Sequence, residues 1–304
     1  MKASKELYSE LFKEYILSSR DIRELQVVLY GMLEKVCFLL DKYNIDYMLS
    51  GGTLLGAIRH GGFIPWDDDV DIMMTRDNYD RFLKYQYELD DDLLFIEPLS
   101  SSRYYCKNPK IFKKNTKYVE ISNANIDTFD MVFIDIFIIE NAPKSKLHRA
   151  IRGFFYDVSY KGASVCMDYL FPSEPIINKA RINNDLDKYY RLRRILGCIF
   201  SHFGGLYFYL RIVDKLGQYR KKTGLYCVPS AISYNREVFS AKIFETISES
   251  RFEQANYKIP RYYDIYLKNL YGDYMQIPPI EKREVHVAYK FKLFNYEKGE
   301  RQNG

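Results

Sequence analysis

Cysteine is scarce in this sequence and gives no sign of pairing. The five cysteines are an odd number and are scattered, and no two of them have the spacing of a zinc-binding pair (Cys37, Cys106, Cys166, Cys198 and Cys227). We therefore expect no structural zinc site, and we expect free thiols in a reducing compartment.

Long apolar runs are also lacking. The first ten residues do not contain the 7 to 15 apolar residues that a signal peptide needs, so we expect a cytoplasmic protein. The apolar run 195–210 contains His202 and the pair Gly204-Gly205, and its 16 residues fall short of the roughly 20 that span a bilayer. Internal repeats and low-complexity segments are absent from the sequence, which argues against a repeat architecture.

Tyrosine and regional basic charge are abundant instead. The 304 residues include 29 tyrosines, which suit partly wet apolar surfaces such as sugar-binding clefts and membrane interfaces. The net charge is +5, but residues 179–222 hold eleven Lys or Arg against three Asp, a local +8, which leaves about −3 for the rest. These basic residues flank the apolar run 195–210, so nucleic acid is not an expected partner. The run is either a pair of core helices or an interfacial segment that contacts anionic lipid.

Two consecutive glycines mark the most informative part of the chain. Gly51 and Gly52 follow a short apolar strand, and a helix is expected to begin near Thr53. Free N–H groups and the positive end of the helix dipole favour phosphate at such a position. Thr53 is expected either to cap the helix or to bind a phosphate oxygen.

A cluster of carboxylates follows shortly afterwards. Asp67, Asp68, Asp69 and Asp71 enter an apolar strand. Because residues two apart on a strand share one face, Asp67, Asp69 and Asp71 are expected to point the same way, about 6.5 to 7 Å apart per pair. Their mutual repulsion favours a cation, and oxygen ligands without a neighbouring Cys favour Mg²⁺ or Mn²⁺. The alternative is a polar turn whose Asp residues bond the backbone. The apolar strand and the nearby glycine turn favour the metal site.

A further carboxylate interrupts the apolar stretch 129–139, which is typical of a central strand. Asp135 is either a hydrogen-bonded structural residue or the third carboxylate of the metal site. In the second case it either ligates a metal or takes the proton of an acceptor hydroxyl.

Periodicity and turn residues predict the remaining elements and an α+β fold. The predicted helices are 4–18, 21–42 with Asp21 as N-cap, one from Thr75 to about Leu89, several within 143–222, and 262–271. The predicted strands are 45–50, 93–98, a hairpin of 109–112 with 117–122, and the central strand above. The last twenty residues are charged and are expected to be loose.

Residues 52–60 and 62–72 together resemble the signature of the LicD family of phosphotransferases, which includes bacterial phosphorylcholine transferases and fukutin-related enzymes. The resemblance extends to Lys110-Ile111, to residues 134–137 and to Tyr271-Gly272-Asp273-Tyr274-Met275. It covers about 20–140 and 255–290.

The resemblance implies a nucleotidyltransferase-like mixed sheet flanked by helices. We expect a single LicD-like domain over 1–304, with a core at about 20–140 and 225–290. A basic, aromatic helical insert is expected at about 143–222.

It also implies an enzyme that moves phosphocholine, or a similar substituent, from a CDP-activated donor to a sugar hydroxyl of a cell-surface glycan or lipid-linked precursor. CDP-choline is the favoured donor. By matching position, the metal ligands or catalytic carboxylates are Asp69, Asp71 and Asp135. The expected donor and phosphate contacts are Ser50, Gly51, Gly52, Thr53, Arg59, His60 and Lys110.

Some roles and functions have alternatives. His60 could equally be a capped surface histidine, and Arg283 and His286 either return to the cleft or lie at a solvated helix end. A nucleotidyltransferase acting on a small molecule would use the same metal ligands, and a non-catalytic glycan-binding protein would use the tyrosines. The segment 179–222 is expected to allow peripheral contact with the inner membrane face.

Overall fold

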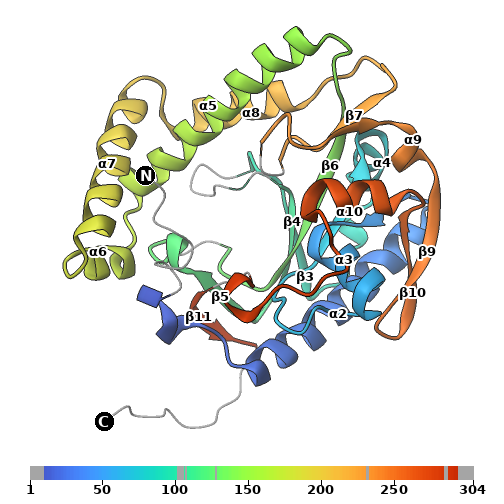
Figure 1. Cartoon of the computed structure of the whole chain (residues 1–304), viewed down its shortest axis with the longest axis horizontal. Coiled ribbons are helices and arrows are strands. Elements are labelled where there is room, and N and C mark those ends of the chain that lie inside the picture. The colour runs from blue at the N-terminus through green and yellow to red at the C-terminus, as the bar shows by residue number, and fades with distance from the viewer. Residues whose placement is uncertain are drawn as a thin grey trace.

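The computed structural model describes residues 10–100, 106, 108–126, 129–230, 233–283 and 287–293. A mixed β-sheet forms the centre, helices pack against it, and four consecutive helices extend from one side (Figure 1). The expected α+β class is confirmed.

The main sheet has the strand order β1-β2-β6-β4-β3, and β7 and β8 continue it beside the end of β6. Its strands are β1 (Met48–Leu49), β2 (Asp71–Thr75), β3 (Leu93–Ile96), β4 (Lys110–Lys113), β6 (Phe133–Asn141), β7 (Leu225–Cys227) and β8 (Val238–Ser240). β2 and β6 run parallel, whereas β4 and β7 pair with β6 antiparallel. The prediction of a central strand in 129–139 is confirmed, because β6 is paired along both edges.

Two small sheets lie beside this core. They pair β9 (Ile247–Phe252) with β10 (Ala255–Pro260), and β5 (Lys117–Glu120) with β11 (Ala288–Lys292). The predicted hairpin of 109–112 with 117–122 is therefore wrong. β4 has β3 and β6 on its two edges, so β5 pairs with a strand from the distant C-terminal region. That strand also corrects the expectation of a loose end for residues 288–292.

The helices that pack near the sheet are α2 (Ser19–Lys42), α3 (Gly51–His60), α4 (Arg76–Phe82), α9 (Lys242–Glu245) and α10 (Tyr263–Tyr271). Short 3₁₀ turns are η1 (Lys13–Tyr15), η2 (Gln86–Glu88), η3 (Ile121–Asn123) and η4 (Ile280–Lys282). The predicted helix 21–42 is confirmed as α2, and 262–271 as α10. The helix after Thr75 ends seven residues before Leu89, at Phe82.

Two predictions at the N-terminal side need correction. Ser18, not Asp21, caps α2: the Ser18 hydroxyl accepts from Asp21 N, and the Asp21 carboxylate accepts from Ser18 N, each at 3.2 Å. Such a reciprocal capping box satisfies two N–H groups at once. Residues 12–18 form a 3₁₀ turn and a connection, so the predicted helix 4–18 does not continue through them. Residues 4–9 of that prediction lie outside the described residues.

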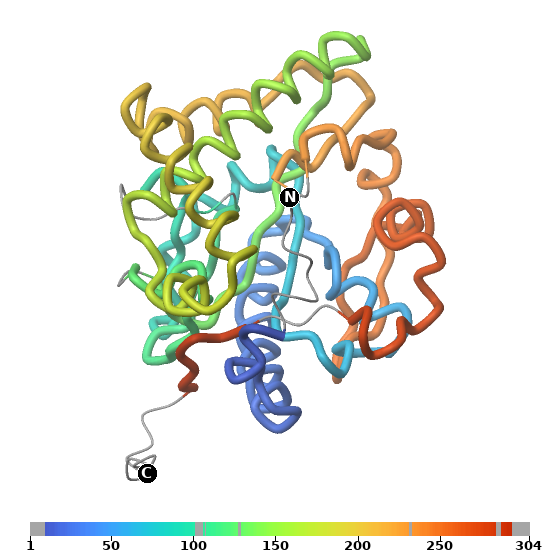
Figure 2. Tube along the Cα trace, turned by 60° about the vertical axis from the view of Figure 1, so that its left-hand side comes forward, coloured from blue at the N-terminus to red at the C-terminus, as the bar shows by residue number. Residues whose placement is uncertain are grey.

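The segment 143–222 is helical, as predicted. It forms α5 (Lys146–Leu170), α6 (Glu174–Ala180), α7 (Asn184–His202) and α8 (Gly205–Gly217), which we call the helical insert. α7 and α8 both pack on α5. Figure 2 shows the insert, coloured yellow-green to gold, gathered on one side of the blue α2. Whether core and insert form one domain, as expected, stays a prediction.

The apolar run 195–210 is divided between two helices. α7 ends at His202, α8 begins at Gly205, and the two are bent by 83°. Among the described helices, none is by itself long and apolar enough to cross a membrane, whereas this bent pair meets the length and composition together.

Candidate active site

Three neighbouring strands place two carboxylates and an ammonium group in one row. Asp71, the first residue of β2, is the register partner of Asp135 in β6, and Asp135 is the partner of Lys110, the first residue of β4. Partners on adjacent strands lie about 5 Å apart and point to the same face. Residues from three separate parts of the sequence therefore meet at one point of the sheet.

Lys110 and Asp135 form a buried ion pair. Lys110 Nζ lies 2.9 Å from Asp135 Oδ2, both side chains are 15% exposed, and Nζ also lies 3.3 Å from the centre of the Phe133 ring. Burial opposes a charged Lys110, but the charges of Asp135 and Glu120 outweigh it and raise the lysine pKa. The other oxygen, Asp135 Oδ1, is buried without a hydrogen-bond partner in the described part of the chain.

The start of α3 lies directly against two of the carboxylates. A Cβ atom on Gly51 would stand 2.7 Å from Asp71 Oδ2, and one on Gly52 would stand 2.9 Å from Asp67 Oδ2. Gly51 also has a φ of +49°, a conformation that favours glycine. Ser50, at the N-cap position, makes no capping hydrogen bond through its side chain. The glycines thus let the positive end of the helix approach the carboxylates closely.

The backbone around Asp71 is fixed by two hydrogen bonds. Asp71 N donates to Thr53 Oγ1 at 2.8 Å, and Ser50 N donates to Asp71 O at 3.0 Å. Of the two roles expected for Thr53, capping of α3 is wrong, because Ser50 is the N-cap residue and the buried Thr53 hydroxyl binds β2 instead. Thr53 therefore holds Asp71 in place.

Asp71 lies in a strongly unfavourable environment for a negative charge. Burial raises its pKa well above the usual value, and the charges of Asp69, Asp135 and Asp67 raise it further, with Lys110 opposing. An ionised Asp71 in this position requires positive charge nearby.

The other carboxylates differ from the expected arrangement. β2 begins only at Asp71, so Asp67 and Asp69 precede the strand. The prediction that these two residues share one strand face with Asp71 is therefore wrong. Tyr118 OH donates to Asp68 Oδ2 at 2.7 Å. Asp69 lines a small cavity of about 110 Å³ together with Lys110 and Asp135.

The two basic candidates at the end of α3 are engaged elsewhere. Arg59 donates to the carbonyl oxygen of Tyr274 at 2.8 Å, although its charge is close enough to Asp67 to interact with it. His60 lies edge-on to Trp66, and burial together with the charge of Arg59 lowers its pKa. The structure does not bring His60 to the row of strand residues.

Arg283 and His286 were the least specific candidates. The Arg283 guanidinium lies 4.0 Å from the centre of the Trp66 ring and donates to Pro278 O, so it returns to the signature segment by stacking on its tryptophan. His286 lies outside the described residues.

The structure adds aromatic and acidic residues that were not among the predicted site residues. Ser50 Oγ lies 3.1 Å from Tyr266 OH, both of them buried, and Tyr266 interacts in turn with buried Glu237. Burial raises the pKa of Tyr271, and the nearby charges of Asp71 and Asp67 raise it further. Tyr271 lies in a segment that carried the family resemblance, which was the available signal, whereas Tyr266 and Glu237 had none.

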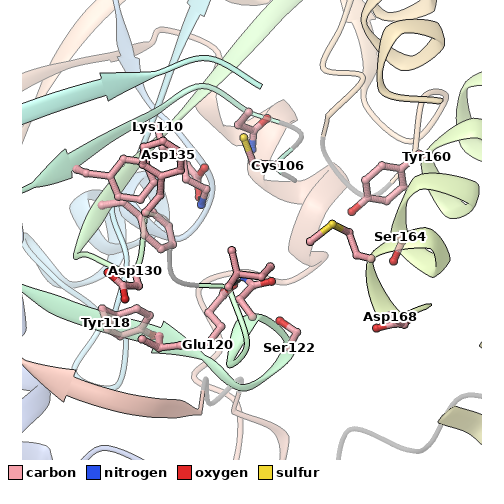
Figure 3. Close-up of a pocket in the computed structure, with 18 of the residues that line it drawn as sticks. Cys106, Lys110, Tyr118, Glu120, Ser122, Asp130, Asp135, Tyr160, Ser164 and Asp168 are labelled. Atoms are coloured by element: carbon pink, nitrogen blue, oxygen red, sulfur yellow. Dashed lines mark hydrogen bonds and ion pairs between the residues drawn. The ribbon is translucent and has the colours of Figure 1, made fainter. Parts of the chain in front are cut away.

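A cavity of about 370 Å³ opens beside Lys110 and Asp135, and the helical insert forms its opposite wall. Figure 3 shows Tyr160, Ser164 and Asp168 of α5 across this space from Lys110 and Asp135. Their spacing of four residues places them on one face of the helix. Arg193 of α7 completes this wall, donating to Ser164 Oγ at 2.8 Å and pairing with Asp168.

The donor set fits a hard divalent cation. Among the described residues, no three His, Cys, Asp or Glu side chains already converge as a metal-binding group. The chemistry nevertheless fits, because Asp135 Oδ1 is buried and unpartnered among the described residues and Asp71 carries uncompensated repulsion. Oxygen ligands of this kind suit Mg²⁺ or Mn²⁺.

Comparison with known proteins identifies a transferase of phosphorus-containing groups. Residues 44–178 match the model of the LicD/FKTN/FKRP nucleotidyltransferase domain. The chain is 28% identical over 290 residues to the lipopolysaccharide cholinephosphotransferase LicD of Haemophilus influenzae, a match that covers 87% of this chain and 95% of that protein. The resemblance seen in the sequence is thereby confirmed: residues 44–178 match the LicD-type domain, and similarity to a LicD protein extends over most of the chain.

Two further relatives match shorter parts. An uncharacterised protein of Rickettsia prowazekii is 30% identical over 189 residues, covering 60% of this chain and 62% of that protein. Human ribitol 5-phosphate transferase FKRP is 45% identical over 53 residues, covering 17% of this chain and 9% of that protein. The resemblance to FKRP is thus high over a short stretch.

Proposed function

We propose that the enzyme transfers phosphocholine, or a similar phospho-substituent, from a CDP-activated donor to a sugar hydroxyl of a cell-surface glycan or lipid-linked glycan precursor. The observation that carries the proposal is the row of Asp71, Asp135 and Lys110 at the start of α3 and at the edge of a cavity. The activities for which the relatives are named, lipopolysaccharide cholinephosphotransferase and ribitol 5-phosphate transferase, support a phospho-substituent and a glycan acceptor.

The donor diphosphate would lie at the N-terminus of α3. The backbone at Gly51 and Gly52 has no side chain to keep a phosphate at a distance, and the helix dipole favours negative charge there. Asp69, Asp71 and Asp135 would hold Mg²⁺ or Mn²⁺, which when bound would neutralise charge on the diphosphate. Lys110 adds a fixed positive charge beside Asp135.

The acceptor would enter the cavity between the sheet and the insert. Its walls combine the aromatic rings of Phe129 and Tyr160 with polar groups such as Ser164 and Asp168, a mixture that suits a sugar. In this position the acceptor hydroxyl would lie near Asp135. Asp135 either contributes to cation binding or takes the proton of that hydroxyl.

The proposal locates the enzyme in the cytoplasm, at the inner membrane face, where a lipid-linked acceptor would be presented. The excess of basic residues in 179–222 supports this location.

A thermal-shift series tests the proposal. The ligands are CDP-choline, CDP-ribitol, CDP-glycerol, CTP and ATP, each with Mg²⁺ or EDTA, on wild type and Asp71→Ala. A ligand at 100 times its Kd stabilises by about 2.7 kcal/mol. We expect a Mg²⁺-dependent shift with one CDP compound, lost in Asp71→Ala. A shift with CTP or ATP alone would favour nucleotidyl transfer, and no shift with any ligand would favour the non-catalytic alternative.

The reaction products separate the two enzymatic possibilities. Mass spectrometry should detect CMP and an acceptor heavier by the phospho-substituent. Release of pyrophosphate would instead show transfer of the nucleotide. Asp71→Ala should reduce turnover roughly 10²- to 10³-fold, the typical loss when an electrostatic group at the reacting centre is removed.

A further inference from the structure

An apolar stripe runs along the outer side of α7. Its exposed residues recur at spacings of three and four, which places them on one face of the helix. They are Leu192, Ile195, Leu196, Ile199 and Phe203, and Tyr207 and Phe208 continue the exposure in the first turn of α8. Phe203, at the bend between the helices, is 78% exposed. We call these seven residues the α7–α8 stripe.

A small movement of α7 within the insert could not bury the stripe, because the opposite side of the helix is already packed. The other side of α7 is buried: Gly197 packs against α5, and Leu186 and Tyr190 pack in a cluster with Ile176 and Ala180 of α6. A Cβ atom on Gly197 would lie 2.0 Å from Val165 O, so the two helices are already in close contact there. Figure 1 shows α7 at the outer edge of the molecule, away from the sheet.

Exposure of this extent is costly in water. Burying a large aliphatic or aromatic side chain is worth about 1.5–3 kcal/mol, and contiguous apolar patches on a monomer normally mark a binding surface. The core-pair interpretation of 195–210 therefore fails for these residues.

Exposed basic residues lie next to the stripe on both helices. Residues 179–222 contain eleven Lys or Arg against three Asp, and Arg191 and Arg211 are exposed on α7 and α8 themselves. The Arg211 guanidinium lies 4.5 Å from the centre of the Tyr207 ring. Apolar residues flanked by Arg and by tyrosines are typical of segments that lie in a lipid headgroup region.

The bend divides the apolar run into two helices that point in different directions. Neither α7 nor α8 alone is long and apolar enough to cross a bilayer, and the 83° angle directs them along different axes. A bent pair of this kind fits a membrane surface, with the bend as its deepest point.

We infer that the α7–α8 stripe docks on an anionic lipid bilayer, with Phe203 inserted at the acyl boundary and the neighbouring basic side chains on lipid phosphates. Arg193 of the same helix lines the cavity beside Asp135. Docking through α7 would therefore hold this cavity close to the membrane surface. The inference concerns a surface outside the strand-end site and does not depend on the proposed reaction.

Vesicle flotation tests the docking with the full chain and no donor or acceptor. The vesicles are phosphatidylcholine, alone or with about 20 mol% phosphatidylglycerol, since basic segments gain about 1 kcal/mol per Lys or Arg at an anionic surface. We expect wild type to float with the anionic vesicles and Ile199→Ser/Phe203→Ser to lose at least about tenfold in partitioning. Val27→Ser/Phe38→Ser, which alters two exposed apolar residues of α2, is the matched control and should float like wild type.

The inference would be overturned if wild type stayed at the bottom of the gradient with both kinds of vesicle, or if the α2 control lost as much vesicle binding as the stripe variant. Insertion itself is measured with Trp66→Phe/Phe203→Trp, because the chain has one tryptophan. Its fluorescence should shift to the blue and be quenched by brominated lipid. The alternative is that a second copy of the chain covers the stripe, and sedimentation without lipid tests it. If wild type formed a stable dimer that the stripe variant abolished, and lipid caused no quenching, the inference would be wrong.

Discussion

Asp71 and Asp135 are direct register partners on adjacent parallel strands, so two carboxylates lie side by side in a largely buried site. Lys110 follows in the same row from β4 and pairs with Asp135. Asp135 is thus paired with a cation, whereas burial and the neighbouring carboxylates disfavour a negative charge on Asp71. Substitutions can therefore test the ion pair and Asp71 separately.

Lys110→Met should destabilise the protein, because it leaves Asp135 buried without its cation. Removing one partner of a buried ion pair typically costs about 3–5 kcal/mol. Urea unfolding in EDTA should show this loss, while Lys110→Arg should retain most of the stability. The double variant Lys110→Met/Asp135→Asn should recover a large part of it. If the double variant were as unstable as the sum of the two single variants, the pair would not be coupled as the structure shows.

Gly51→Ala should reduce activity more than its backbone strain explains. Both Gly51 and Gly61 have positive φ angles, of 49° and 69°, so alanine should cost about 1–2 kcal/mol at each. A Cβ on Gly51 would collide with Asp71 Oδ2, whereas one on Gly61 would have no atom of the described residues within 4 Å beyond those of its own chain neighbours. We expect turnover to fall at least tenfold further in Gly51→Ala than in Gly61→Ala at similar stability. Equal losses in the two variants would argue against close contact of α3 with Asp71.

Thr53→Val should act through Asp71 and not through the donor. It leaves the N–H of Asp71 without its acceptor, at a cost of about 1–3 kcal/mol, whereas Thr53→Ser preserves the hydrogen bond. We expect a lower Tm and kcat for the valine variant, with near wild-type values for serine. A valine variant with unchanged Tm and only a raised donor KM would instead indicate the phosphate-binding role expected from the sequence.

Glu237 should make stability depend on pH. Burial is the main cause that raises its pKa to about 7 from 4.5, with hydrogen bonding to Tyr266 opposing. The folded state thus holds a proton that the unfolded state has lost, so stability decreases as pH rises from about 4.5 to 7 and is constant above. Glu237→Gln should remove this slope and make the protein more stable than wild type at pH 8, by up to roughly 3 kcal/mol.

Denaturant titrations at pH 5, 6, 7 and 8 measure this difference. At pH 4.5 and below the two proteins should be similar, because Glu237 is then protonated in the folded state. A constant difference between wild type and variant across the range would contradict a raised glutamate pKa.

Local signals were sufficient for most helices and for the central strand. α2, α10 and the insert have apolar residues at helical spacing, and β6 is a nearly continuous apolar run, so short-range chemistry specifies them. The prediction of a hairpin of 109–112 with 117–122 failed because no local feature of two strands close in sequence specifies which strands they pair with. β11, the partner of β5, lies far along the chain, and such pairing depends on which sheet edges are already filled.

The sequence by itself determined the chemistry available: a glycine pair that can open a helix, a run of carboxylates, and one acidic residue within an apolar strand. Each is a property of a few consecutive residues. Only the tertiary structure decided which groups meet, namely Lys110 with Asp135, Tyr118 with Asp68, and Thr53 with Asp71 N. It also decided that α5 faces the site and that the α7–α8 stripe faces outward. These relationships follow from strand register and helix packing, which join residues far apart in the chain.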